Sequence, residues 1–303
     1  MNERIRKLTE LTLKGDTYVY PVKTDFDDSD LLLPRREAES KRICEYILNQ
    51  EPRLTPYSAM TGYFTFDGSV VGDAFRRSGH KHFGQMHRLF YCKPIDGLST
   101  FEWQHATADY SKILGKGIRG IIGEINESLG HHDDPEEREF LFALRRVAEA
   151  LVAWAGKCSA RALACAEQIE VPAYRENLKR LSKTLLRVPE NPPETFYEAV
   201  LSIYFCFATD PDSVGTLDRY LYPFYERDLR LGRLTREEAK AYLQELFLML
   251  QSSTHYKSDR FTRGGESHFC IGGYLPDGSD GFTELSRLIV ESLVDLPDRK
   301  SVV

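Results

Sequence analysis

The sequence has 303 residues, of which 42% are hydrophobic, and a formal net charge of −6 at pH 7. This length and composition are typical of a globular protein with one large domain or two ordinary ones. The slightly acidic balance and the lack of a basic run argue against nucleic acid as a partner. No apolar run reaches the ~18 residues of a membrane span, and the charged start MNERIRKLTELTLKGD has no signal-peptide core.

Cysteines and histidines show no metal-ligand spacing. The cysteines form no CxxC pair, which favours buried or free thiols in a reducing cytoplasm over disulfides or a metal site. Neighbouring histidines in the first third of the chain lie two and five residues apart, whereas a helical ligand pair needs a spacing of four. We therefore expect no metal site. The residues are Cys44, Cys92, Cys158, Cys165, Cys206, Cys270, His80, His82, His87, His131 and His132.

The first third of the chain is weakly patterned. Residues 1–35 are polar, and we expect them to form a lead-in that lies on the surface. A helix is expected from Glu37 to Leu48. Residues 53–84 are rich in Gly, Thr, Tyr and Phe with short alternations, which predicts short strands and turns.

The middle of the chain is strongly helical. Either Thr107 or Asp109 can cap a helix from Tyr110 to about Leu129, whose apolar residues keep a 3.6-residue period. Long helices are also expected over 135–169 and 176–188. This segment is poor in Pro and Gly and has no break in composition, which indicates one continuous domain.

A mostly apolar helix, from about Glu194 to Phe207, is expected after Pro192 and Pro193, because proline is tolerated in the first turn of a helix. A polar break over 209–215 follows, and then a tyrosine-rich helix from about Leu217. The break is either a pocket floor at the end of a buried helix or an ordinary Asx, Pro and Gly turn.

The last part of the chain mixes helices with a short strand. A capping box begins a helix over 235–250, residues 252–266 are predicted to be a loop, and 267–275 have strand-like residues. Thr283 can cap a last helix that reaches about Val294. Long helices with widely separated short strands favour an α/β fold over an antiparallel sheet, because such strands pair through long crossovers.

Several motifs in a fixed order resemble the glycyl radical enzymes of the pyruvate formate-lyase-like family, over roughly residues 30–297. The resemblance implies the N-terminal half of a ten-stranded α/β barrel, helix-rich, with the active site inside the barrel. The motifs are Arg53-Leu-Thr-Pro-Tyr, Phe66-Asp-Gly-Ser, His105-Ala-Thr-Ala-Asp-Tyr, RVPxNPPxTFxEA from Arg187, GxLDxYLYPFYxxDLxxGxLTxEEA from Gly215, and Ile271-Gly-Gly-Tyr-Leu-Pro-Asp-Gly.

The resemblance also bears on domain limits. It implies that residues 1–297 are the N-terminal portion of a pyruvate formate-lyase-type domain. Residues 298–303 match an in-frame translation of a common sequencing-adapter sequence. Our hypothesis is that the native chain continues after about Pro297 and that 298–303 are a non-native tail.

The chemistry that the resemblance implies is radical chemistry. Family members hold a radical on a glycine in a C-terminal loop, and it converts a cysteine on a second loop to a thiyl radical that abstracts hydrogen from substrate. No RVSGY-like motif and no cysteine-loop context occur in this sequence. The resemblance therefore implies no catalytic residue and no bound cofactor within this chain, which alone would be inactive.

The longer enzyme implied by the resemblance is anaerobic and cytoplasmic, and it forms a homodimer. Its glycine radical is installed by a radical-SAM activating enzyme. Its reaction is the cleavage or elimination of C–C or C–X bonds of a small metabolite, as in a lyase, a dehydratase or a formate C-acetyltransferase. The competing hypothesis is a non-catalytic half-barrel that binds a partner chain or a small molecule.

Two places are candidate substrate sites. His105 falls where pyruvate formate-lyase has an arginine that clamps a carboxylate, so histidine there argues against pyruvate and for a hydroxylated substrate; the alternative is a core histidine. Asp212 and Ser213 are the nearest polar substitutes in a segment that is several residues shorter than in relatives, where Thr216 also replaces the usual arginine. Three other polar residues nearby, Asp109, Asp218 and Arg219, are expected to make helix caps and surface pairs.

Overall fold

The structure is a computed structural model that describes residues 1–17, 32–64, 107–209, 213–254 and 268–297. Several residues singled out by the sequence lie outside the described residues, so no structural statement is made about them. They are His80, His82, His87, Cys92, His105, Asp212 and the segment 298–303.

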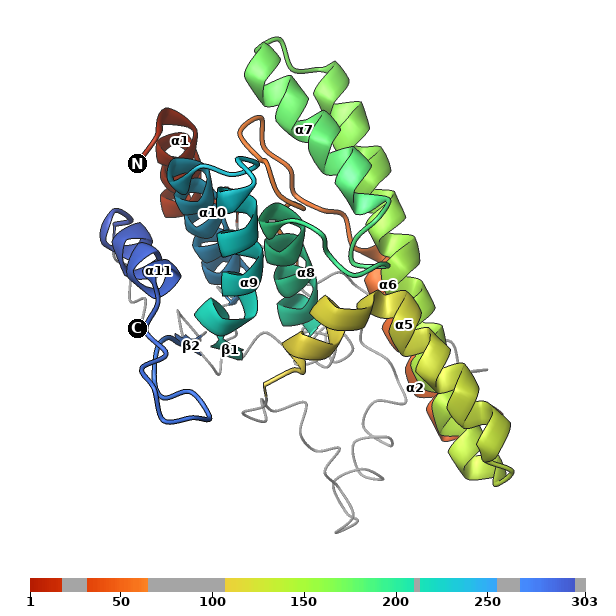
Figure 1. Cartoon of the computed structure of the whole chain (residues 1–303). Coiled ribbons are helices and arrows are strands. Elements are labelled where there is room, and N and C mark those ends of the chain that lie inside the picture. The colour runs from red at the N-terminus through yellow and green to blue at the C-terminus, as the bar shows by residue number, and fades with distance from the viewer. Residues whose placement is uncertain (18–31, 65–106, 210–212, 255–267, 298–303) are drawn as a thin grey trace, which may run out of the picture.

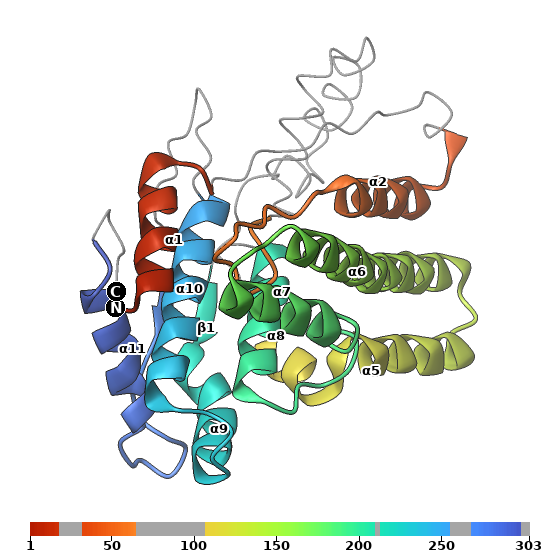
Figure 2. The same ribbon diagram turned by 90° about the horizontal axis from the view of Figure 1, so that it is seen from above.

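The described elements form two groups of helices beside a short parallel ladder (Figures 1 and 2). In one group, the long helix α6 packs against α2, α5 and α7; in the other, α10 packs against α1, α8 and α11. In chain order the elements are α1 (Glu3–Lys14), α2 (Arg35–Asn49), α5 (Tyr110–His131), α6 (Pro135–Glu167), α7 (Pro172–Leu185), α8 (Phe196–Thr209), β1 (Ser213–Thr216), α9 (Leu217–Arg230), α10 (Arg236–Thr254), β2 (His268–Cys270) and α11 (Glu284–Val294).

The first residues are a packed helix, so the prediction of a surface lead-in over 1–35 is wrong for its first part. Asn2 caps α1 through the N–H of Ile5, and Gly15 ends the helix in the left-handed conformation. Ile5 and Leu8, one helical turn apart, are fully buried. A single apolar stripe was enough to bind the helix to α10, although its average polarity is high.

Most other predicted helices are confirmed, with differences at their ends. Helix α8 begins at Phe196, so Pro192 and Pro193 lie in the preceding loop and not in its first turn. Helix α10 continues to Thr254, into the predicted loop over 252–266. Strand β2 has three residues, fewer than the 267–275 segment predicted. No helix in the described part of the chain is long and apolar enough to cross a bilayer.

Helix α5 has a break that the sequence pattern did not reveal. Gly117 has a φ of 65°, and the next two N–H groups, of Ile118 and Arg119, donate to the carbonyls of Pro189 and Glu190 at 2.9 and 2.8 Å. A Cβ atom at Gly117 would lie 2.5 Å from the Glu190 oxygen. The glycine therefore lets the loop before α8 pack directly on α5.

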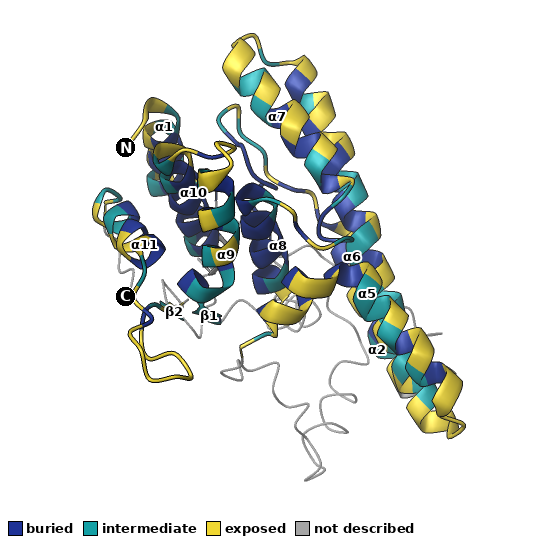
Figure 3. Ribbon diagram, in the orientation of Figure 1, coloured by how far each residue is buried: buried dark blue, intermediate teal, exposed yellow. Residues whose placement is uncertain are grey.

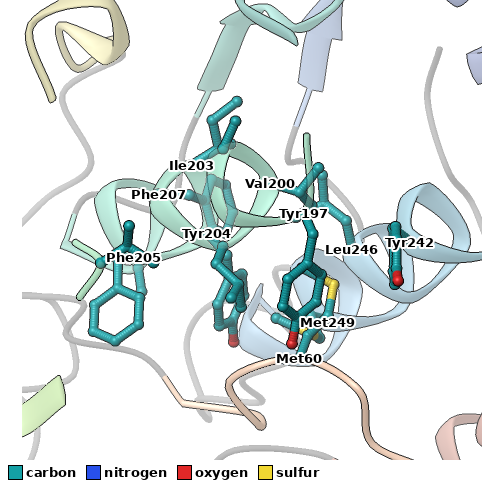
Figure 4. Close-up of a cluster of buried hydrophobic side chains, with 14 of the residues drawn as sticks. Met60, Tyr197, Val200, Ile203, Tyr204, Phe205, Phe207, Tyr242, Leu246 and Met249 are labelled. Atoms are coloured by element: carbon teal, nitrogen blue, oxygen red, sulfur yellow. The ribbon is translucent and has the colours of Figure 1, made fainter. Parts of the chain in front are cut away.

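The core is centred on α8, which is apolar on all sides and almost fully buried (Figure 3). A helix of this kind is stable only when other elements surround it. Its residues Val200, Ile203, Tyr204 and Phe207 pack with Leu246 and Met249 of α10 (Figure 4). At the other side Phe205 and Trp154 lie edge to face, with ring centroids 5.5 Å apart, which joins α8 to the long helix α6.

Candidate functional site

The ladder of parallel strand segments is the feature that the helices position. Strands β1 and β2 pair in parallel, with Ser213 opposite His268 and Thr216 opposite Cys270, and Thr107 forms a parallel bridge with Ser213. The segments at Thr107 and β1 lead directly into α5 and α9 (Figure 1). Since ligands of parallel α/β proteins bind beyond the carboxyl ends of the strands, this edge is the candidate functional site.

The two faces of the ladder differ in burial. Val214 is fully buried, and the ring of Phe269 stacks on Phe247 of α10 at a centroid distance of 5.4 Å. His268 and Cys270, which alternate with Phe269, are exposed, as is Thr107. One face therefore packs on the helices, and the opposite face carries polar side chains that solvent or a ligand can reach.

Of the predicted substrate residues, the structure describes only Ser213, because His105 and Asp212 lie outside the described residues. Ser213 is half-buried at the start of β1. Its hydroxyl accepts the Gly215 N–H at 3.1 Å, and its carbonyl accepts the Tyr110 hydroxyl at 2.8 Å. The Tyr110 bond fixes β1 to the first turn of α5, so Ser213 is held by both neighbouring elements.

Asp109 is a helix cap, as predicted, because its carboxylate accepts the N–H of Lys112 at 3.0 Å. Asp218 lies in the first turn of α9, as predicted, but the prediction of a surface pair is wrong. Its side chain is 1% exposed and accepts hydrogen bonds from the Gly272 N–H at 2.7 Å and from the Ser286 hydroxyl at 2.5 Å. The next residue, Arg219, donates to the carbonyls of Gly272 and Tyr274.

These bonds fix the loop that follows β2. Gly272 and Gly273 have φ values of 69° and 77°, a conformation in which glycine is the least strained residue. The loop can therefore present its N–H and carbonyl groups to Asp218 and Arg219. Further along α9, burial and the nearby Glu284 carboxylate raise the pKa of Tyr225 to about 12.

Sequence reasoning missed two tyrosines at this edge. The rings of Tyr110 and Tyr220 lie 5.5 Å apart, one from the first turn of α5 and one from the first turn of α9. The only available signal was that each tyrosine follows a strand-like segment at the start of a helix. Among the described residues, no group of three or more His, Cys, Asp or Glu side chains could hold a metal ion.

A sequence model of the family described as pyruvate formate lyase-like matches residues 90–300. The chain belongs to this family. The prediction of family membership is therefore confirmed.

Curated relatives in this family are lyases and dehydratases. The isethionate sulfite-lyase of Bilophila wadsworthia is 31% identical over 246 residues, an alignment that covers 70% of this chain and 29% of the relative. The trans-4-hydroxy-L-proline dehydratase of Clostridioides difficile is 27% identical over 199 residues, which cover 60% of this chain and 25% of the relative. The matched segment thus spans less than a third of each relative.

Solved structures show the same fold. The chain superposes with a TM-score of 0.79 on a Roseburia inulinivorans protein described for 1,2-propanediol dehydration, at 17% identity. It superposes with a TM-score of 0.77 on the glycerol-bound B12-independent glycerol dehydratase from Clostridium butyricum, at 18% identity. Each alignment covers 98% of this chain and 46% of the other chain. The chain therefore has the fold of about half of a glycyl radical enzyme barrel, which confirms the predicted fold class.

Proposed function

We propose that this chain is the N-terminal portion of a glycyl radical enzyme, a lyase or dehydratase that eliminates a leaving group from a small hydroxylated metabolite. The observation that carries the proposal is the family match over 90–300, together with relatives that are lyases and dehydratases. Candidate substrates are those that these relatives act on or bind: isethionate, trans-4-hydroxy-L-proline, 1,2-propanediol and glycerol.

In this proposal the chain supplies one wall of the pocket. The exposed face of the ladder, with Thr107, Ser213, His268 and Cys270, turns toward the interior of the complete barrel. His105 and Asp212 remain predicted substrate-binding residues beside Ser213. Residues 1–297 would act as one domain piece, and residues 298–303 would be a tail foreign to it.

The radical machinery would come from residues that this sequence does not include. A glycine radical, when present in the longer protein, supplies the hydrogen abstraction that begins catalysis. None of the cysteines here lies in a cysteine-loop context, and no RVSGY-like motif occurs. No radical step is therefore assigned to the residues of this chain. An activating enzyme, a homodimer and an anaerobic cytoplasm belong to the same proposal.

The test begins with long-read sequencing of the source DNA across the codons for residues 296–303. We expect an open frame that continues into a cysteine loop and a glycine loop. The longer protein, treated with a radical-SAM activating enzyme under anaerobic conditions, should show a glycyl radical by electron paramagnetic resonance and turn over one of the candidate substrates. A genuine stop codon at this place would overturn the proposal and favour a non-catalytic half-barrel that binds a partner.

A further inference from the structure

Gly215 allows two hydroxyl-bearing side chains to meet at the carboxyl edge of the ladder. Its φ is 65°, in the left-handed region, and it has no side chain to occupy the space beside its Cα. A Cβ atom there would lie 2.9 Å from the Thr107 methyl group and 3.0 Å from the Tyr220 hydroxyl. These two side chains, from different strand–helix junctions, are therefore near neighbours over the same glycine.

Neither hydroxyl is used by the described part of the fold. No hydrogen bond joins the side-chain hydroxyl of Thr107 or of Tyr220 to another described residue, whereas the Tyr110 hydroxyl donates to Ser213 and the Tyr222 hydroxyl to Glu226. Thr107 is exposed and Tyr220 is half-buried. Packing against the Tyr110 ring holds the Tyr220 ring in place, so its hydroxyl is positioned without being consumed.

The groups that meet at this point carry no charge. The nearest atoms to the missing Cβ belong to a threonine methyl group and a phenol. The charged residues that follow in α9 are engaged elsewhere, since Asp218 binds Gly272 and Ser286, and Arg219 binds two carbonyls. Two neutral hydroxyls that can both donate and accept match the hydroxyls of a neutral diol, and they offer no counter-charge to a sulfonate or carboxylate.

We propose that Thr107 and Tyr220 bind the adjacent hydroxyls of a small neutral 1,2-diol in the substrate pocket. This inference rests on the proposed function and names a substrate class for it. It also disfavours isethionate, an anion, although an isethionate sulfite-lyase is among the relatives.

The test measures ligand binding to the folded, monodisperse 303-residue chain by saturation-transfer NMR. The probes are 1,2-propanediol, glycerol and isethionate. Tyr220→Phe and Thr107→Val each remove one hydroxyl with little change of shape, and each should weaken diol binding about three- to tenfold, the effect of one neutral hydrogen bond. Tyr222→Phe, on the same helix, is the matched control and should leave binding unchanged. The melting temperature of each variant should equal that of the parent chain.

Each contrary result has a separate meaning. No detectable diol binding, equal binding by Tyr220→Phe, or preferential binding of isethionate would each overturn the diol site and leave the radical-enzyme proposal standing. A stop codon in the source DNA would overturn the radical-enzyme proposal whatever the binding results. Loss of diol binding in Tyr222→Phe as well would show that the effect comes from α9 as a whole, which also contradicts the assignment of Tyr220.

Discussion

The carboxylate of Asp218 lies 2.5 Å from the hydroxyl of Ser286, a residue 68 positions further along the chain. The same carboxylate oxygen accepts the Gly272 N–H, and the other oxygen accepts the N–H of Arg219. One buried acid thus links α9 to the loop after β2 and to the first turn of α11. The position of β2 beside β1 depends on this link, and so does the candidate site.

Replacing Asp218 by alanine should lower the free energy of unfolding by about 2–4 kcal/mol, because a buried N–H and a buried hydroxyl lose their acceptor. Urea unfolding followed by circular dichroism measures the change. Asp277→Ala is the control, since Asp277 is exposed and bonds only within its own turn, to Ser279. Equal losses in the two variants would contradict a structural role for the buried carboxylate.

Two glycines with nearly the same φ separate backbone strain from steric contact. Gly215 has a φ of 65° with Thr107 and Tyr220 close to its missing Cβ, whereas Gly232 has a φ of 64° and no atom within 4 Å. Gly232→Ala should cost about 1 kcal/mol, from strain alone. Gly215→Ala should cost about 1–2 kcal/mol more, because Cβ contacts of this kind force neighbours to shift. Thermal unfolding of both variants checks the difference, and equal losses would show that the contacts at Gly215 are relaxed in solution.

The helices could be predicted because their apolar residues recur at helical spacing and their caps are local. Asp109, Thr235 and Thr283 each make their capping bonds within three residues, as the sequence predicts. Helix α1 escaped prediction because only Ile5 and Leu8 mark its buried stripe in a polar segment. A short stripe gains its stability from the partner helix, which local sequence does not show.

The site could be predicted only in part, because its contacts join residues that are far apart in the chain. Sequence reasoning placed Ser213 near the pocket, and the structure puts it in the ladder beside Thr107 and His268. It placed Asp218 at the start of a helix, which is correct, but a helix-start acid can equally face solvent or the interior. The spacing of residues in one helix does not reveal that Gly272 and Ser286 come to meet it.

Glu245 anchors the N-terminal helix from the side of α10. Its side chain is 1% exposed, pairs with Arg4 at 2.5 Å, and accepts the N–H groups of Ala59 and Met60 at 2.9 and 3.1 Å. Glu245→Ala should lower the free energy of unfolding by about 3–5 kcal/mol, because it leaves a largely buried arginine without its partner. Hydrogen exchange should also become faster in α1 than in α7.

The control for Glu245 is Glu10→Ala. Glu10 pairs with Arg6 on the exposed side of α1, so its loss should cost no more than about 1 kcal/mol. If both variants unfold at the same urea concentration, the buried pair contributes no more than a surface pair. If α1 keeps its slow exchange in Glu245→Ala, the helix is held by its apolar stripe alone.

Tyrosine ionisation should make the protein unstable at high pH. Burial and the Glu284 carboxylate raise the pKa of Tyr225 to about 12, from an ordinary value near 10 in the unfolded chain. Its neutral form is favoured in the fold, so the stabilisation is fully present below pH ~10 and is lost as the pH rises from ~10 through ~12. Burial raises the pKa of Tyr63 and Tyr197 in the same direction.

The share of Tyr225 can be isolated by an absorbance titration at 295 nm combined with urea unfolding at several pH values from 8 to 12. Tyr225→Phe should remove one phenol that ionises near pH 12 and make the alkaline loss of stability less steep. Glu284→Gln should instead move that ionisation to lower pH, because it removes the negative charge beside the hydroxyl, which lies 3.3 Å from the carboxylate. A titration curve that is the same in Glu284→Gln as in the parent chain would mean that burial alone sets the pKa of Tyr225.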